Sequence, residues 1–306
     1  MIKTIPNGVF PTMVTPFTDD NKIDYNGVEK ILNWYHEKGV AGIFAICQSS
    51  EIFYLSFEER LELLQFIIKN APKDMSIVAS GHTADDLDTQ IYEANKFIEQ
   101  GVDAYVFISN RFAKADEDDS VFLKNAEYVV KNIPEIALGI YECPYPYKRL
   151  LTPEVMKELI KIGPFRFLKD TCCDTVEIGK KLDAVKGTDF KIYNANAATL
   201  LDTLKLGVAG YSGVMANFHP EIYAELCNCF NKDPERAQNL QDLVGFFSVA
   251  ECQQYPVNAK YYLGLEGLGI TYNSRARDAS LFKKNHQLEI DQMYGLTQEL
   301  KKVYNI

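Results

Sequence analysis

The sequence has few residues of the kinds that bind metal ions, and their spacing does not gather them. The four histidines are scattered along the chain, at His36, His82, His219 and His286. The seven cysteines have no C-x-x-C spacing, since Cys172 and Cys173 are adjacent and Cys227 and Cys229 are two residues apart. An odd number of cysteines in such positions indicates neither a disulfide framework nor a zinc site. We therefore expect reduced thiols, a cytoplasmic location and no bound metal.

Excess positive charge and long apolar runs are missing as well. The chain carries 32 Lys and Arg against 42 Asp and Glu, a formal net charge of -10, and has no Lys/Arg-rich run. A nucleic-acid partner requires a basic surface that displaces counterions from phosphates, so this class of partner is excluded. No apolar run approaches the ~20 residues that span a membrane, and residues 1–6 lack the long apolar core of a signal peptide. We expect no membrane partner either.

What the chain does have is a succession of short apolar runs separated by longer amphipathic stretches. Eight runs are typical of strands, at residues 8–14, 41–46, 77–79, 105–108, 136–140, 165–168, 191–193 and 208–211. Their apolar residues are continuous rather than alternating, which favours strands covered on both faces, as in a parallel sheet. The intervening stretches begin with helix-capping patterns, such as Ser56-x-x-Glu59 and Thr152-Pro153.

Eight strands that are each followed by a helix predict an α/β fold, a (β/α)₈ TIM barrel, over residues 1–231. A doubly wound sheet is the competing architecture. It usually has a glycine-rich phosphate turn after its first strand, and residues 11–16 (Pro-Thr-Met-Val-Thr-Pro) contain no glycine. Residues 232–306 have no strand pattern and are predicted to form three helices packed on the barrel. The first should bury Leu240, Leu243, Phe246, Phe247 and Ala250.

Active sites of such barrels lie at the carboxyl ends of the strands, and two chemically unusual residues occupy these ends. Lys169 ends the run 165–168, where partial burial would lower its pKa and give a neutral amine that attacks a carbonyl. Moving a lysine pKa from about 10.4 to about 7 requires roughly 4–5 kcal/mol. Tyr141 ends the preceding run, where a phenol can relay protons. Taken singly, a solvated lysine and an ordinary rim tyrosine are the more frequent interpretations.

A third candidate is the loop after the second run, Cys47-Gln48-Ser49-Ser50-Glu51. Serine hydroxyls and backbone N–H groups in such a loop can bind a substrate carboxylate. The alternative interpretation is a capping loop that binds no ligand.

These candidates belong to a set of segments that resembles the family of dihydrodipicolinate synthase and N-acetylneuraminate lyase over nearly the whole chain. Tyr141-Glu142-Cys143-Pro144 is similar to its Tyr-x-x-Pro signature, and Phe167-Leu168-Lys169-Asp170-Thr171 is similar to its Schiff-base strand. Further similar segments, in the family's order, are residues 8–17, 49–51, 55–60, 216–221 and 255–260.

The resemblance implies a class I aldolase or lyase that needs no cofactor or metal and is usually a homotetramer, otherwise a dimer. Lys169 would form an imine with pyruvate or a similar 2-keto acid, Tyr141 would relay protons, and the second substrate would be an aldehyde. Ser49 and nearby backbone amides would bind the keto-acid carboxylate. Other residues expected to contact the substrate are Gln48, Ser50, Arg111, Phe112, Ala195, Asn196 and Val214. The reaction would form or cleave a C–C bond, or dehydrate a 2-keto-3-deoxy acid.

Departures from the family pattern concern the substrate. Residues 109–112 (Ser-Asn-Arg-Phe) replace Thr-Pro-Tyr-Tyr, so a second relay tyrosine is missing. Pro146 stands where the synthase has an arginine for its aldehyde's carboxylate, and Ala197-Ala198 stand where the lyase has an acidic pair for sugar hydroxyls. A site without the polar partners that a substrate requires disfavours that substrate, so we expect poor turnover of aspartate semialdehyde and N-acetylneuraminate.

Three alternatives stay open. The first is the lysine-pathway enzyme 4-hydroxy-tetrahydrodipicolinate synthase itself, with a rearranged relay. The second is a keto-acid-binding homologue without turnover. The third is a metal-dependent barrel enzyme in which Lys169 is structural. Borohydride reduction in the presence of pyruvate separates the imine-forming enzymes from the metal-dependent one. A turnover assay separates the enzymes from the binding protein.

Overall fold

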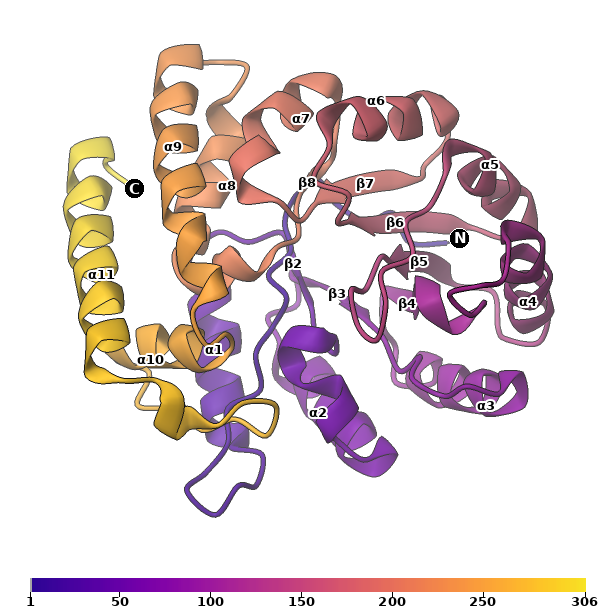
Figure 1. The fold of residues 1–306 in the computed structure, drawn as a ribbon, viewed down its shortest axis with the longest axis horizontal. Helices are drawn as coiled ribbons and strands as arrows, with labels where there is room; N and C mark the ends of the chain where they lie inside the picture. The colour runs from indigo at the N-terminus through magenta and orange to yellow at the C-terminus, as the bar shows by residue number, and fades with distance from the viewer. Residues whose placement is uncertain (1) are drawn as a thin grey trace.

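Residues 2–306 are described by a computed structural model, which has the predicted (β/α)₈ barrel, so the fold class is confirmed (Figure 1). One parallel sheet has the strand order β1-β8-β7-β6-β5-β4-β3-β2. The strands are β1 (Gly8–Val9), β2 (Gly42–Phe44), β3 (Ser76–Ala79), β4 (Ala104–Ile108), β5 (Ala137–Tyr141), β6 (Phe165–Asp170), β7 (Lys191–Asn194) and β8 (Gly210–Tyr211).

The barrel closes between β1 and β2 through backbone bonds that extend past the two-residue strand β1. Ala41 N donates to Val9 O (3.0 Å), and Phe44 N donates to Pro11 O (2.9 Å). The backbone pairing of the segment 8–14 therefore extends beyond the two residues of β1, in agreement with the length of the apolar run. Closure leaves no sheet edge unpaired at this position.

A ring of helices surrounds the strands (Figure 1). They are α1 (Tyr25–Glu37), α2 (Phe57–Asn70), α3 (Leu87–Ile98), α4 (Asp119–Lys131), α5 (Pro153–Ile162), α6 (Thr175–Ala184), α7 (Leu200–Leu206) and α8 (Pro220–Cys229). The expected caps are present. Ser56 and Glu59 satisfy each other's backbone N–H groups at the start of α2, and Thr152 accepts from Val155 N at the start of α5. These bonds satisfy N–H groups that the first helical turn leaves free.

Aromatic rings fill the inside of the barrel. The Phe167 ring stacks on Tyr193 with a centroid distance of 4.6 Å, and its edge contacts involve Phe10 (5.6 Å) and Phe44 (6.0 Å). All four rings are fully buried. These rings fill the middle of the barrel, and a cavity opens above them at the carboxyl ends of the strands.

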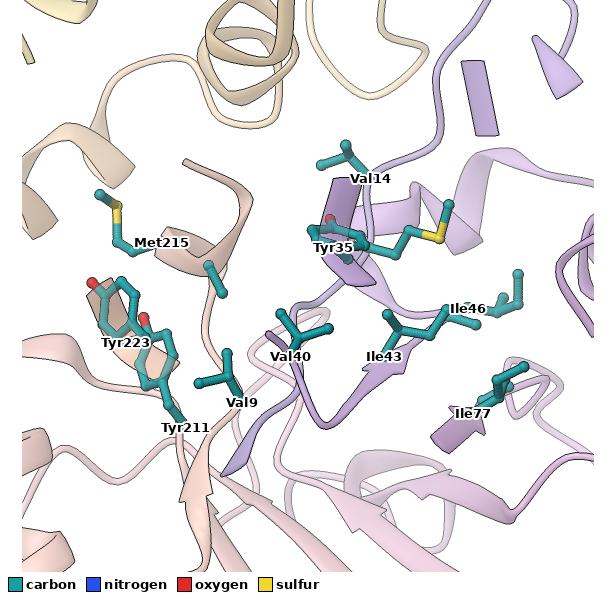
Figure 2. Packing of buried hydrophobic residues seen from close by; sticks show 14 of the residues in the cluster. Val9, Val14, Tyr35, Val40, Ile43, Ile46, Ile77, Tyr211, Met215 and Tyr223 are labelled. Carbon is teal, nitrogen blue, oxygen red and sulfur yellow. The ribbon is translucent and has the colours of Figure 1, made fainter. Parts of the chain in front are cut away.

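A second apolar layer lies between the strands and the surrounding helices. Figure 2 shows a part of it, in which Val9, Ile43 and Tyr211 from the strands lie near Tyr35 of α1 and Tyr223 of α8. Both faces of the strands are thus covered. This is the physical reason for the continuous apolar runs in the sequence.

Three further helices follow the barrel: α9 (Pro234–Phe247), α10 (Val257–Leu265) and α11 (Lys284–Tyr304). They lie beside α1 and α8, and α9 packs against α7 and α8 (Figure 1). The buried face of α9 includes Leu240, Val244 and Phe247, which lie at i, i+4 and i+7. The prediction that Phe246 is buried was wrong, since its side chain is 71% exposed one position away from that face.

Candidate active site

The pairing of β5 with β6 places Tyr141 directly opposite Lys169. Both side chains project from strand ends toward the same interior, and the Lys169 Nζ atom lies 4.2 Å from the centroid of the Tyr141 ring. Lys169 is only 4% exposed. Burial lowers the pKa of this lysine below its ordinary value, while Cys47, Cys143 and Glu251 oppose the shift. Desolvation thus favours the neutral amine, which is the nucleophilic form.

The Tyr141 hydroxyl has a partner in the loop after β2. It donates to Gln48 Oε1 at 3.2 Å, and the Cys143 Sγ atom lies 3.6 Å from the same oxygen. Burial, followed by the neighbouring Cys143, raises the pKa of Tyr141 well above its ordinary value. The phenol therefore stays protonated and available as a donor. The side-chain oxygen of Gln48 accepts the hydrogen bond from this phenol.

The loop itself is a short 3-10 helix, Gln48–Ser50, that follows β2. Ser49 Oγ donates to Thr12 Oγ1 at 3.0 Å and lines the cavity described below. Ser50 is different, because its hydroxyl lies 2.7 Å from both Met13 O and Ala45 O and the side chain is fully buried. Ser49 lines the cavity, whereas Ser50 holds the loop against the barrel.

A cavity of about 660 Å³ opens at this end of the barrel, within the range of small-molecule sites. Seven of the ten residues predicted from the sequence line it: Gln48, Ser49, Tyr141, Lys169, Ala195, Asn196 and Val214. They come from the ends of several strands that are distant in the sequence. The structure brings them together because the carboxyl ends of parallel strands meet at one face of the barrel.

Three predicted residues do not line the cavity: Ser50, Arg111 and Phe112. The Phe112 ring is fully buried against Phe107 (5.0 Å) and Phe122 (5.5 Å). Arg111 binds Asp85 at 2.6 Å, and its guanidinium lies over the Phe53 ring. The turn after β4 directs these side chains into the core and toward the outer rim, so direct substrate contact is not supported for them.

Two cationic side chains that were not predicted from the sequence line the cavity. Pro146 does not line the cavity, but Lys148, two residues further along the same loop, does, and so does Arg277. The sequence contains a hint of Lys148, because a lysine and an arginine follow Pro146 within three residues. No local pattern indicated Arg277, because it comes from the C-terminal extension.

Ala197 and Ala198 do not line the cavity. Their carbonyl oxygens accept from Gln241 Nε2 of α9, at 2.9 Å and 3.1 Å. This segment attaches the extension to the barrel. At the positions where the lyase has its acidic pair, this chain uses backbone carbonyl groups to bind α9.

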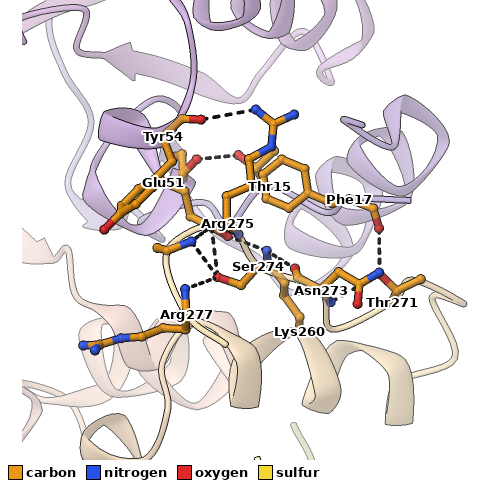
Figure 3. A network of polar contacts seen from close by, with 12 residues as sticks. Thr15, Phe17, Glu51, Tyr54, Lys260, Thr271, Asn273, Ser274, Arg275 and Arg277 are labelled. Atoms are coloured by element: carbon orange, nitrogen blue, oxygen red, sulfur yellow. Dashed lines mark hydrogen bonds and ion pairs between the residues drawn. The ribbon is translucent and has the colours of Figure 1, made fainter. Parts of the chain in front are cut away.

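The C-terminal extension forms one wall of the site and is fixed to it by a buried ionic network (Figure 3). Lys260 Nζ of α10 lies 2.5 Å from Glu51 Oε1, and Glu51 Oε2 accepts from Arg275 N (2.6 Å) and Ala276 N (2.7 Å). Burial lowers the pKa of Lys260 to about 8, with Glu51 opposing the shift. Glu51 directly follows the loop with Gln48 and Ser49, so the extension holds that loop in place.

Two properties of the described residues, 2–306, concern ligands and surroundings. They contain no group of three or more His, Cys, Asp or Glu side chains placed to hold a metal ion. None of their helices has the length and apolarity needed to cross a membrane.

Comparison with known proteins agrees with this geometry. A model of the dihydrodipicolinate synthetase family matches residues 5–290. The 4-hydroxy-tetrahydrodipicolinate synthase of Shewanella putrefaciens (strain CN-32) is 24% identical over 297 residues, which are 96% of this chain and 99% of that protein.

Solved structures with the same fold include dihydrodipicolinate synthase DapA-2 from Bacillus anthracis. It has a TM-score of 0.86 and 18% identity and covers 96% of this chain and 99% of that chain. The chloride-inhibited dihydrodipicolinate synthase from Acinetobacter baumannii, solved with pyruvate, has a TM-score of 0.85 and 22% identity, again over 96% and 99%. The match to the family model extends over nearly the whole chain. The chain therefore belongs to the dihydrodipicolinate synthetase family, whose members are lyases of the aldolase type.

Proposed function

We propose that the chain is a Schiff-base-forming lyase that makes or breaks a C–C bond of a 2-keto acid such as pyruvate. The observation that carries the proposal is the amine of Lys169, which is buried beside Tyr141 in a cavity and has a lowered pKa. The A. baumannii enzyme and an E. coli K12 prophage protein of the same family, both with this fold, were solved with pyruvate.

In the proposed reaction, the neutral amine of Lys169 adds to the C2 carbonyl, and loss of water leaves the imine. The imine withdraws electrons from C3, which permits deprotonation and attack on an aldehyde, or the reverse cleavage. The steps need a group that gives and takes protons beside Nζ. The Tyr141 hydroxyl is suited to this, since it is protonated and held by Gln48.

The keto-acid carboxylate is assigned to the loop after β2. Gln48 and Ser49 line the same cavity as Lys169, so the Ser49 hydroxyl and the backbone N–H groups of these two residues are the donors that we assign to the carboxylate. An anion there gains charge-assisted hydrogen bonds while the carbonyl carbon stays near Nζ. No step in this scheme uses a cofactor or a metal.

A second candidate is the 4-hydroxy-tetrahydrodipicolinate synthase reaction itself, the activity named for the S. putrefaciens relative. Lys148 and Arg277 favour it, because they provide cations in the cavity for the carboxylate of aspartate semialdehyde. The replaced segment 109–112 and Pro146 oppose it. The specificity constants for aspartate semialdehyde and for a panel of 2-keto-3-deoxy acids decide between the synthase and a divergent aldolase or dehydratase.

The imine is tested directly by incubation with pyruvate and borohydride. We expect one reduced pyruvate per chain, located on Lys169 by peptide mass spectrometry. Lys169→Ala should abolish both labelling and turnover, since the nucleophile has no substitute in the site. Lys148→Ala is the matched control: it removes another lysine of the same cavity and should leave the labelling on Lys169.

The pH dependence of labelling follows from the lowered pKa of Lys169. The fraction of Lys169 in the neutral amine form increases with pH, so labelling should increase too. The increase should reach its plateau at a lower pH than for an ordinary lysine of pKa 10.5. Labelling of another residue, or none, would contradict the assignment. Labelling without turnover of any aldehyde or keto-acid substrate would identify a binding protein instead.

A further inference from the structure

Behind the two reacting residues lies a buried cluster of three charged side chains that the proposed chemistry does not use. Lys181 of α6 places its Nζ atom 2.6 Å from Glu142 Oε1 and 2.5 Å from Asp170 Oδ2. The two carboxylate side chains are fully buried, and that of Lys181 is 3% exposed. Glu142 directly follows Tyr141 at the end of β5, and Asp170 directly follows Lys169 in β6.

The position of the cluster follows from the geometry of strands. Successive side chains in a strand point to opposite faces, so residues next to an inward pair point outward. Tyr141 and Lys169 are register partners that face the cavity. Their successors, Glu142 and Asp170, therefore face outward toward α6, where one ammonium group contacts both. A single cation thus joins the ends of the two strands that carry the reacting residues.

The carboxylates also fix the backbone around these ends. Glu142 accepts from Leu151 N through Oε1 and from Thr171 N through Oε2, each at 2.8 Å. Asp170 Oδ1 accepts from Cys172 N at 2.9 Å. Glu142 therefore binds the segments after β5 and after β6 at once, and Asp170 holds the turn after Lys169.

Without the ammonium, this arrangement is electrostatically unfavourable. Two buried carboxylates side by side repel one another and have lost their hydration. Burial and the neighbouring Asp170 raise the pKa of Glu142, and Lys181 opposes this shift. The thiol of Cys172 also faces the cluster, and burial, then Asp170, raises its pKa to about 12.

We propose that Lys181, with Glu142 and Asp170, is a positioning residue that holds the Lys169 amine over the Tyr141 ring. The inference rests on the proposed function, because it assigns a role to the cluster in imine formation. Lys181 lies outside the cavity and does not touch the substrate. Its loss should therefore slow imine formation without weakening the binding of the keto-acid carboxylate at the loop after β2.

The test compares Lys181→Met with wild type by the rate of borohydride trapping as a function of pyruvate concentration. We expect the maximal trapping rate to fall at least ~10-fold, while the pyruvate concentration for half-maximal trapping changes less than ~3-fold. Lys180→Met is the matched control, since Lys180 is the adjacent lysine on α6 and binds only the exposed Glu177. It should behave as wild type in both measurements.

A rescue variant separates positioning from general stability. Lys181→Met/Asp170→Asn removes one of the two buried carboxylates together with the cation, so the two strand ends no longer carry charges that repel one another. We expect this double variant to recover much of the lost trapping rate. If Lys181→Met does not fold, Asp170→Asn alone provides the test, with an expected ~3- to 10-fold fall in trapping rate at unchanged half-saturation.

The outcomes distinguish this proposal from the proposed function. Absence of labelling in wild type contradicts the imine itself. Normal labelling in wild type together with an undiminished rate in folded Lys181→Met, or in Asp170→Asn, overturns the positioning role alone. A loss of thermal stability without a change in the maximal trapping rate leads to the same conclusion, because a purely structural cluster would behave in that way.

Discussion

At the scale of single residues, the chemistry depends on how burial changes two ordinary side chains. Lys169 and Tyr141 are polar groups placed above the aromatic core of the barrel, and the Tyr141 ring contacts Phe44 edge-on at 5.5 Å. Desolvation acts on them in opposite directions: it lowers the pKa of the amine and raises that of the phenol. Desolvation therefore favours the neutral amine of Lys169 and the protonated phenol of Tyr141, the two forms that the proposed imine formation uses.

The relay is tested by Tyr141→Phe, which removes one hydroxyl and preserves the ring. We expect turnover to fall by a factor of about 10²–10⁴, because no other group is assigned to carry the proton, while the circular dichroism spectrum stays the same. Tyr145→Phe removes a hydroxyl from a half-exposed ring of the same cavity and should have little effect. A Tyr141→Phe enzyme that retains more than half of the wild-type rate would show that another group moves the proton.

At the scale of elements, the start of α8 contains a buried histidine that no partner satisfies. The His219 ring stacks on Tyr223 at 5.6 Å and lies near Phe247, and neither ring nitrogen has a hydrogen-bond partner in the described residues. Burial lowers the pKa of His219 to about 3 from its ordinary value of 6.5. The folded chain keeps the ring neutral at a pH where the unfolded chain protonates it.

The linkage gives a stability prediction with a definite sign. Between pH 6.5 and about 3 the unfolded state binds one more proton at His219, so folding stability decreases as pH falls, by up to about 1.4 kcal/mol per pH unit. His219→Phe keeps an aromatic ring in this stack and should reduce the loss of stability measured by urea unfolding at pH 7.5 and pH 5. His36→Gln, at an exposed histidine, is the control and should retain the wild-type difference. Equal acid sensitivity of His219→Phe and wild type would contradict this account.

The turn after β4 shows why the direction of a side chain is hard to predict from the sequence. Arg111 and Phe112 follow β4 in the position where the family has substrate contacts, and the sequence assigned them to the site. The short turn Ser109–Arg111 directs Phe112 into the core, and Arg111 pairs with Asp85 from the loop before α3. A change of one residue in a turn changes the face on which a side chain lies, and sequence position alone does not reveal it.

At the scale of the whole molecule, the extension is both a wall of the site and a candidate surface for assembly. Its exposed apolar side chains include Phe246 of α9, Val249 just beyond α9, and Val303 of α11. Resemblance to the family predicts a homotetramer or a dimer, although one structural neighbour is described as a monomeric dihydrodipicolinate synthase variant. Exposed large apolar side chains are candidates for contacts between subunits.

Analytical ultracentrifugation at micromolar concentration measures the assembly. We expect a particle of two or four times the chain mass of 34.7 kDa. Phe246→Glu should shift it toward smaller species if α9 is part of the interface. A particle of one chain mass for the wild type would contradict the predicted assembly.

The sequence by itself determined the barrel and the position of Lys169 and Tyr141 at neighbouring strand ends. Continuous apolar runs require coverage on both faces, and residues that end such runs meet at one rim, so the pattern alone predicts that Lys169 and Tyr141 lie close together. Only the tertiary structure decided the rest. Lys181 contacts Glu142 across 39 positions and Lys260 contacts Glu51 across 209, and Arg277 reaches the cavity from the extension. Periodicity reports which face of its own element a residue occupies, whereas these contacts depend on which elements pack together and on the direction of each side chain.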